Sequence, residues 1–228
     1  MNKIESIKIP KDEVLRYLGY KKQIIDNNTM GLVNETINEA QKIIELKYIL
    51  SKNKCILKDG GVHVEGTKLT LLGNDIKEHL KNSKEVLLLA VTLGREIEKR
   101  ISYYEKINLT KAVILDSCAT AAVEELCDEI EKVIKKEMIK ENETITFRYS
   151  PGYGDLPLDI QSDFLKSINA EKLIGLTVSS HNLLMPRKSV TAVIGIIDKK
   201  YEQHKKGCEV CKNYENCSFR REGISCGR

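Results

Sequence analysis

The amino-acid sequence predicts an α+β fold, and three observations carry that prediction. Two apolar runs of eight residues, 86–93 and 190–197, have the length and composition of buried strands. A continuous helical pattern extends from Thr110 to about Met138. Strands and helices mix along the chain without the strict alternation of a doubly wound parallel sheet, which favours α+β.

The remaining elements follow from capping and turn residues. Pro10, with two acids two and three residues after it, is typical of the first turn of a helix. Asn74 is expected to cap one helix and Thr110 to cap the long one. In chain order we expect helices over 10–18, 31–50, 75–80, from 94 onward, 110–138 and 159–168, and strands within 55–72 and over 86–93, 144–149, 176–180 and 190–197.

Charge and cysteine are unevenly distributed along the 228 residues. The net charge of the whole chain is +4, and it falls entirely within the last thirty residues, which hold eight Lys and Arg against four acids. Four of the seven Cys lie there as well. We therefore divide the chain into a neutral body, residues 1–198, and a basic, Cys-rich C-terminal tail, residues 199–228.

The same arithmetic excludes several classes of protein. No apolar run approaches the roughly 20 residues that a membrane-spanning helix needs, and the N-terminus has no signal-peptide pattern. We expect a cytoplasmic protein, whose thiols stay reduced. The neutral body and the absence of clustered aromatic residues argue against a nucleic-acid partner.

The tail cysteines predict a metal site. Four thiolates close together in a reducing compartment suit a tetrahedral zinc ion or an iron–sulfur cluster, and the nearby Lys and Arg favour the thiolate form. The alternative is a disordered or oxidisable tail. The predicted ligands, spaced as C-x2-C-x5-C-x8-C, are Cys208, Cys211, Cys217 and Cys226.

The segment 148–157 is the first candidate ligand site in the body. Two glycines and two prolines predict a rigid turn in which Gly152 lets a ligand approach the backbone closely. Tyr153 offers a flat ring, and Arg148 could hold a carboxylate through two hydrogen bonds. The pattern suits a small ligand with a carboxylate at one end and a ring at the other, and the alternative is an ordinary tight loop.

The second candidate is one face of the long helix. Small residues over 117–122 would let a ligand or another element approach the helix backbone. Beyond them, Glu124 and Asp128 lie on the same face, and Glu124 could accept hydrogen bonds from an ammonium or hydroxyl group. The alternative is a close helix–sheet contact with a solvated acidic end.

Together these segments resemble the reductive-activation domain of cobalamin-dependent methionine synthase, which binds S-adenosylmethionine. The resemblance covers roughly residues 10–197 and includes the strand and helix before the loop and Met185-Pro186 before the late strand. It implies a single curved domain with a mainly antiparallel, twisted sheet and long helices. The family motif Arg-x-x-x-Gly-Tyr with a following Pro is matched by Arg148, Gly152, Tyr153 and Pro157.

The resemblance also implies a function. Such domains act when the cobalamin has oxidised to Co(II): a flavodoxin or ferredoxin-type donor supplies one electron, and bound S-adenosylmethionine remethylates the Co(I). By the resemblance, Arg148 would hold the methionyl carboxylate, and Glu124 would contact the polar end. Ser150, Gly152 and Tyr153 would hold the adenosyl part. No catalytic residue is implied, and the cobalamin would be carried by a partner, a methionine synthase or another corrinoid protein.

An alternative function stays open. Gly19 stands where the family has an acidic contact to the ligand, and the family's late-strand Tyr has no counterpart near Val190. The chain would then be a redox or adaptor protein that does not bind S-adenosylmethionine. In that case the tail, with an iron–sulfur cluster or zinc, would dock a corrinoid partner.

Overall fold

The computed structural model describes residues 4–21, 23–138, 142–201 and 215. The predicted body lies almost wholly within them, and the four predicted metal ligands of the tail lie outside them. In chain order the elements are α1 (Lys11–Tyr17), α2 (Asn27–Ile43), β1 (Lys47–Lys58), β2 (Gly61–Val64), β3 (Thr70–Leu72), α3 (Asn74–Leu80), β4 (Glu85–Thr92), α4 (Glu96–Ile107), α5 (Leu109–Met138), β5 (Glu143–Ile145), η2 (Leu158–Ile160), α6 (Gln161–Ser167), α7 (Ala170–Ile174), β6 (Thr177–Val178), β7 (Leu184–Met185), β8 (Ser189–Asp198) and η3 (Lys199–Tyr201).

A six-stranded sheet forms the centre of the body. Its strand order is β3-β2-β1-β4-β8-β5, and each of its pairings is antiparallel. The long strand β1 joins the two parts, because Lys47–Lys54 pair with β4 and Cys55–Lys58 pair with β2. The α+β prediction and the expected antiparallel sheet are therefore confirmed.

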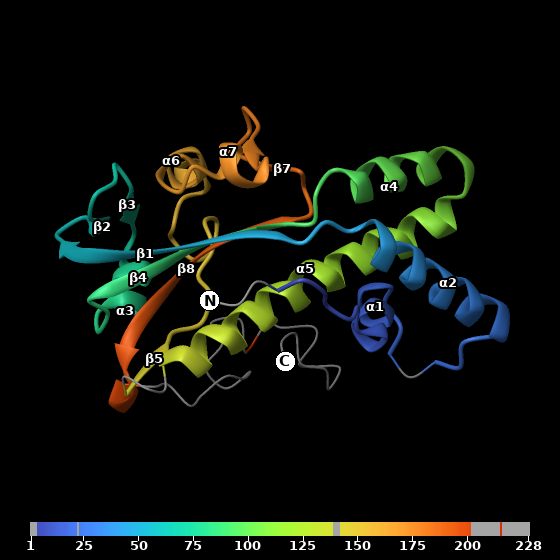
Figure 1. Ribbon diagram of the computed structural model, residues 1–228, viewed down its shortest axis with the longest axis horizontal. Coiled ribbons are helices and arrows are strands. Elements are labelled where there is room, and N and C mark those ends of the chain that lie inside the picture. The colour runs from blue at the N-terminus through green and yellow to red at the C-terminus, as the bar shows by residue number, and fades with distance from the viewer. Residues whose placement is uncertain (1–3, 22, 139–141, 202–214, 216–228) are drawn as a thin grey trace.

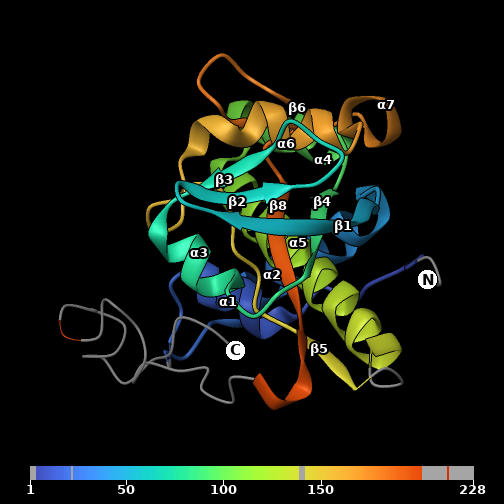
Figure 2. The same cartoon turned by 90° about the vertical axis from the view of Figure 1, so that its left-hand side faces the viewer.

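Both faces of this sheet are covered. Figure 1 shows α5 crossing one face, α6 and α7 lying on the other, and α1, α2 and α4 gathered towards one end of α5. The view along the sheet in Figure 2 separates the same two layers. Leu87 and Leu89 of β4 belong to the core on the α5 side, whereas Val86 and Leu88 belong to the core on the α6 side. A strand buried on both faces is apolar at successive positions, which explains the run at 86–93.

The predicted C-terminal end of the second helix, at residue 50, was wrong. α2 ends at Ile43, and Tyr48, which fits the helical stripe, belongs to β1. An apolar residue at such a position fits both periodicities, and the antiparallel ladder with β4 decides between them. The N-terminal end begins earlier than predicted, because the Asp26 side chain accepts hydrogen bonds from the backbone of Asn28 and Thr29.

Two predicted helix caps were also wrong. Asn74 is the first residue of α3 and not its N-cap. The carboxylate of Asp155 serves as the cap, since it accepts the backbone N–H of Asn74 at 2.6 Å. Thr110 lies inside α5, and the Asn108 side chain accepts the N–H of Lys111 at 3.0 Å instead. In both places a residue with better geometry satisfies the free N–H groups of the first turn.

The other elements follow the predictions closely. The helix expected over 159–168 is η2 followed by α6, whereas α7 and β7 were not expected. The predicted strand 144–149 keeps ladder pairing only to Ile145. Among the described residues, no helix is long and apolar enough to cross a membrane.

Candidate functional site

Arg148 lies in an extended segment that follows β5 and stays alongside β8. Tyr149 exchanges two backbone hydrogen bonds with Val193, both at 2.9 Å. The Tyr149 side chain is buried in the core on the α6 side. Successive side chains of an extended chain point to opposite faces, so Arg148 points to the face that carries α5.

The guanidinium group of Arg148 is surrounded by three carboxylates of α5. Its Nη2 donates to Glu124 Oε2 at 3.1 Å and to Asp128 Oδ1 at 3.0 Å. Its Nη1 is buried and lies 3.0 Å from Glu131 Oε1, without the alignment of a hydrogen bond. The spacing i, i+4, i+7 puts the three acids on one face of the helix. We call these four residues the Arg148 cluster.

The three carboxylates differ in how far they are buried. The side chain of Glu124 is 45% exposed, that of Asp128 29% and that of Glu131 11%, beside 19% for Arg148. Burial raises the pKa of the neighbouring Cys127 thiol to about 12, so this thiol adds no charge. The cluster sets one guanidinium against three carboxylates, and Lys132 of α5 also interacts electrostatically with Asp128.

Backbone hydrogen bonds within the turn after Arg148 stabilise it. The N–H of Tyr153 donates to the carbonyl of Ser150 at 3.0 Å, and the N–H of Gly152 donates to the carbonyl of Leu156 at 2.9 Å. Gly152 has φ +90°, a backbone conformation that favours glycine. Tyr153 is 68% exposed, and its ring meets that of Tyr149 edge-on. Ser150, Gly152 and Tyr153 thus form one hydrogen-bonded turn, in which Tyr153 is exposed.

Packing fixes the far end of the turn. A Cβ at Gly154 would collide with the hydroxyl of Tyr149 and the carboxylate of Asp75. Asp155 reaches the start of α3, where it accepts the N–H groups of Asn74 and Asp75. The position of the turn relative to the sheet therefore depends on contacts to a helix about eighty residues earlier in the chain.

His79 of α3 supports the chain just before Arg148. Its Nε2 lies 3.0 Å from the carbonyl of Phe147 and 2.9 Å from the hydroxyl of Thr146. Its ring packs between those of Phe147 and Tyr149, with centroids 4.3 and 5.1 Å away. Burial lowers the pKa of His79 below its ordinary value of 6.5, which favours the neutral ring in the folded protein.

The small-residue stretch of α5 packs against the sheet, which was the alternative to a ligand-binding face. Cys118, Ala119 and Ala122 are fully buried in the core on the α5 side. Cys118 and Cys127 are small core residues, and burial raises the pKa of the Cys118 thiol to about 12. Only the acidic end of this face reaches the site.

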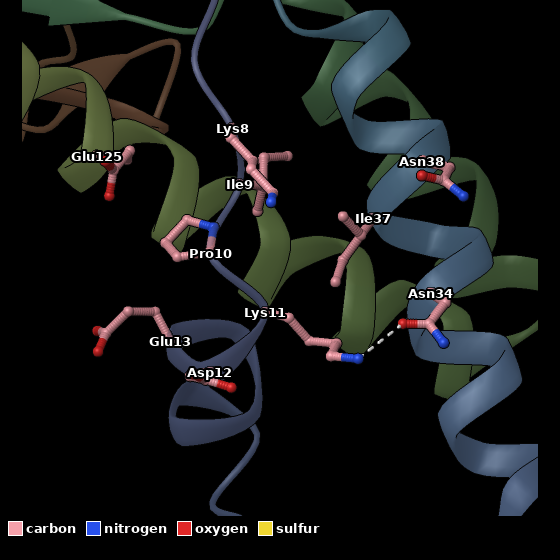
Figure 3. Close-up of a pocket in the computed structure, with 10 residues that line it drawn as sticks. All are labelled: Lys8, Ile9, Pro10, Lys11, Asp12, Glu13, Asn34, Ile37, Asn38 and Glu125. Carbon is pink, nitrogen blue, oxygen red and sulfur yellow. Dashed lines mark hydrogen bonds between the residues drawn. The ribbon is translucent and has the colours of Figure 1, made fainter.

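A groove of about 920 Å³ lies beside α5, between α1 and α2. Figure 3 shows Ile37 and Ile9 facing its interior and Lys11 reaching Asn34 across one end. None of the five predicted ligand-binding residues lines it, although Glu125 is the sequence neighbour of Glu124. The lining residues are Lys8, Ile9, Pro10, Lys11, Asp12, Glu13, Asn34, Ile37, Asn38 and Glu125.

The structure therefore brings together Arg148 and Glu124, two of the predicted site residues, and adds two that were not predicted to bind. Asp128 was placed on the same helix face as Glu124 but was given no binding role, and Glu131 was missed. The sequence feature that could have identified Asp128 and Glu131 is their i+4 and i+7 spacing from Glu124. Among the described residues, no three His, Cys, Asp or Glu side chains are placed to hold a metal ion.

A search of solved structures gives the decisive comparison. A crystal structure of the MetH reactivation domain bound to AdoHcy matches 94% of this chain and 83% of that chain, with a TM-score of 0.61 and 11% sequence identity. The chain has the fold of that domain. At this identity the likeness establishes the fold alone, and what the domain binds is a property of that protein.

The sequence comparisons are weaker. No family model matches the chain. A curated protein, ribonuclease Z of Borrelia hermsii, is 27% identical over 104 residues. That match covers 45% of this chain and 32% of the ribonuclease, so the chain spans about a third of the length of the curated protein it matches.

Proposed function

We propose that this chain binds S-adenosylmethionine at the Arg148 cluster and serves as the activation subunit of a cobalamin-dependent methionine synthase or a related corrinoid protein. The observation that carries the proposal is the fold, which matches the reactivation domain seen with AdoHcy over 94% of the chain. The placement of Arg148 beside an exposed turn supports it, because this is where the family motif falls.

Each residue has a role in the proposal. Arg148 holds the carboxylate of the ligand, and the exposed ring of Tyr153 stacks against its adenine. Ser150 and Gly152 form the backbone against which the adenosyl part lies. Glu124, the most exposed of the three acids, leaves Nη2 to the ligand carboxylate and takes up the ammonium group.

The reactive metal belongs to the partner. When bound, the partner's cobalamin would accept the methyl group after one-electron reduction by a flavodoxin or ferredoxin-type donor. What this chain's own residues do is bind the methyl donor, orient it and present its sulfonium centre beside Tyr153.

Calorimetric titration of S-adenosylmethionine tests the binding step. Wild type should bind, and Arg148→Ala should bind at least about a hundredfold more weakly, because a charge-assisted carboxylate contact is lost. Arg100→Ala is the matched control: it removes an Arg paired with Glu39 at 3.0 Å, outside the site, and should bind normally. Absence of binding by wild type would refute the proposal.

We also propose that the tail holds a metal through Cys208, Cys211, Cys217 and Cys226. Anaerobic purification followed by a spectrum and metal analysis tests this. A broad absorption near 400 nm indicates an iron–sulfur cluster, and a colourless protein with one zinc per chain indicates zinc. Cys208→Ser should lose the metal. Cys55→Ser should keep it, because burial raises the pKa of the Cys55 thiol to about 11 and a thiol is a poor ligand.

A further inference from the structure

The chain leaves β5 through a β-bulge. The ladder of β5 with β8 ends on the pair of Ile145 with Ile196. The next backbone pairing with β8 is the isolated bridge of Tyr149 with Val193. Three residues, 146–148, therefore lie opposite only two residues of β8, and one extra residue opposite an uninterrupted partner strand makes a β-bulge. We call residues 146–148 the bulge.

The bulge decides to which face of the sheet Arg148 points. Side chains directly opposite each other in an antiparallel pair lie on the same face. If the register of β5 continued, Arg148 would lie opposite Val193, whose side chain belongs to the core on the α6 side. Because of the bulge, Tyr149 takes that place, and Arg148 points to the face that carries α5 and its acids.

Hydrogen bonds from side chains hold the bulge in place. In a regular hydrogen-bonded pair of an antiparallel ladder, both bonds join backbone groups. Here the N–H of Thr146 donates to the carbonyl of Gly195 at 2.9 Å, whereas the N–H of Gly195 donates to the Thr146 hydroxyl at 2.8 Å. The carbonyl of Phe147 lies 3.0 Å from Nε2 of His79. A carbonyl oxygen only accepts, so Nε2 carries the proton and donates it to this bond.

The packing of α3 against β8 brings this donor to the bulge. Gly195 leaves room for the end of α3, because a Cβ there would collide with the side chains of Leu80 and Ser83. His79 precedes Leu80 in α3, and the same close approach puts its ring against the bulge. The donor for the Phe147 carbonyl thus comes from a helix 68 residues earlier in the chain.

We propose that the bulge aims Arg148 at its ligand and that His79 is the positioning residue that holds the bulge. The inference rests on the proposed function and adds one residue to it. His79 acts on Arg148 and not on the ligand, through the carbonyl of Phe147, the residue just before Arg148. Loss of the His79 donor leaves this carbonyl without its partner, so the bulge relaxes and the guanidinium leaves its place beside α5.

Substitutions that keep or remove a single nitrogen test the role of His79. S-adenosylmethionine is titrated calorimetrically into wild type, His79→Ala, His79→Asn and His79→Gln. The amide nitrogen of a glutamine takes the place of Nε2, and that of an asparagine takes the place of Nδ1. His79→Gln should therefore bind within about twofold of wild type, whereas His79→Ala and His79→Asn should bind about tenfold more weakly. The matched control is His63→Ala, which removes a ring whose Nδ1 lies 3.3 Å from the Thr70 hydroxyl on β2 and β3, and it should bind normally.

A double-mutant cycle without ligand separates the inference from the proposed function. His79 holds the carbonyl before Arg148, and Glu131 lies beside Nη1 of the same arginine. Changes at independent sites add, whereas changes that share a partner do not. His79→Ala and Glu131→Gln together should therefore shift the urea midpoint by an amount that differs from the sum of their separate shifts. His63→Ala with Glu131→Gln should give the sum.

The two experiments have distinct failures. Additive shifts for the His79 pair, or wild-type affinity of His79→Ala for S-adenosylmethionine, would overturn the inference and leave the proposed function intact. If wild type binds no S-adenosylmethionine, the proposed function itself fails, and the unfolding cycle still decides whether His79 holds Arg148 in place.

Discussion

Two ion-pair clusters on the same helix differ in their charge balance. Near the start of α5, Lys111 pairs with Glu35 at 2.7 Å and with Glu39 at 3.0 Å. Glu39 also accepts from Arg100 and from the hydroxyl of Tyr104. This Lys111 cluster has two cations and two carboxylates and is neutral. Further along α5, the Arg148 cluster has one cation and three carboxylates.

The two clusters also differ in what they join. The Lys111 cluster joins α2, α4 and α5, and its charges satisfy one another, so a ligand has nothing to add. The Arg148 cluster joins α5 to the turn at 148–157, where the aromatic ring of Tyr153 is exposed. Lys132, one turn further along α5, also interacts electrostatically with Asp128.

Neutralising Lys111 should produce the largest loss of stability. Lys111→Met leaves the half-buried carboxylate of Glu39 with one cation fewer and should lower the free energy of unfolding by about 2 kcal/mol. Lys132→Met, which removes an exposed pair from the same helix, should change it by less than about 0.5 kcal/mol. Urea unfolding measures both. If Lys111→Met weakened S-adenosylmethionine binding as much as Arg148→Ala, the distinction between the clusters would be lost.

Removing a helix cap should have a smaller effect that depends on place. Asp155→Ala and Asp26→Ala each remove a cap, of α3 and α2 respectively, and each should cost about 1 kcal/mol. Because Asp155 also fixes the turn beside Arg148, only its replacement should weaken ligand binding, by about threefold. Parallel unfolding and calorimetric measurements on both variants check this. Equal ligand affinities would show that the turn needs no support from α3.

Acidification should have the smallest effect. Burial lowers the pKa of His79 in the folded state, so the unfolded chain binds a proton more readily. Stability contributed by the neutral ring is therefore complete above the ordinary pKa of 6.5 and declines as the pH falls below it. Thermal unfolding of wild type and His79→Gln between pH 8 and 5 measures this. The slope below pH 6.5 should be shallower in His79→Gln, and an unchanged slope would contradict the assignment.

Much of the fold could be predicted from local pattern. The apolar run at 86–93 reads as a strand because a strand buried on both faces needs no alternation, and β4 confirms it. The length of α5 follows from a helical pattern that extends from Thr110 to about Met138. The end of α2 could not be predicted, because the apolar spacing up to Tyr48 fits either period. Only pairing with β4 makes that segment a strand.

The site was predictable in part. The resemblance to a family motif identified Arg148 and Glu124, and the structure places them in contact. The cap of α3 was assigned to Asn74 because capping is usually local, whereas its acceptor, Asp155, comes from eighty residues away. Glu131 was missed because an acid on an exposed helix face is ordinarily solvated.

The sequence by itself determined the glycine turn after Arg148, the acidic spacing of α5 and the strands on either side. It did not determine that Arg148 faces three carboxylates. That depends on the pairing of Tyr149 with Val193, which buries the tyrosine on one side of the sheet and sends the arginine to the other. Side-chain direction in an extended chain reverses with each residue, so a register set by distant strands decides which charges meet.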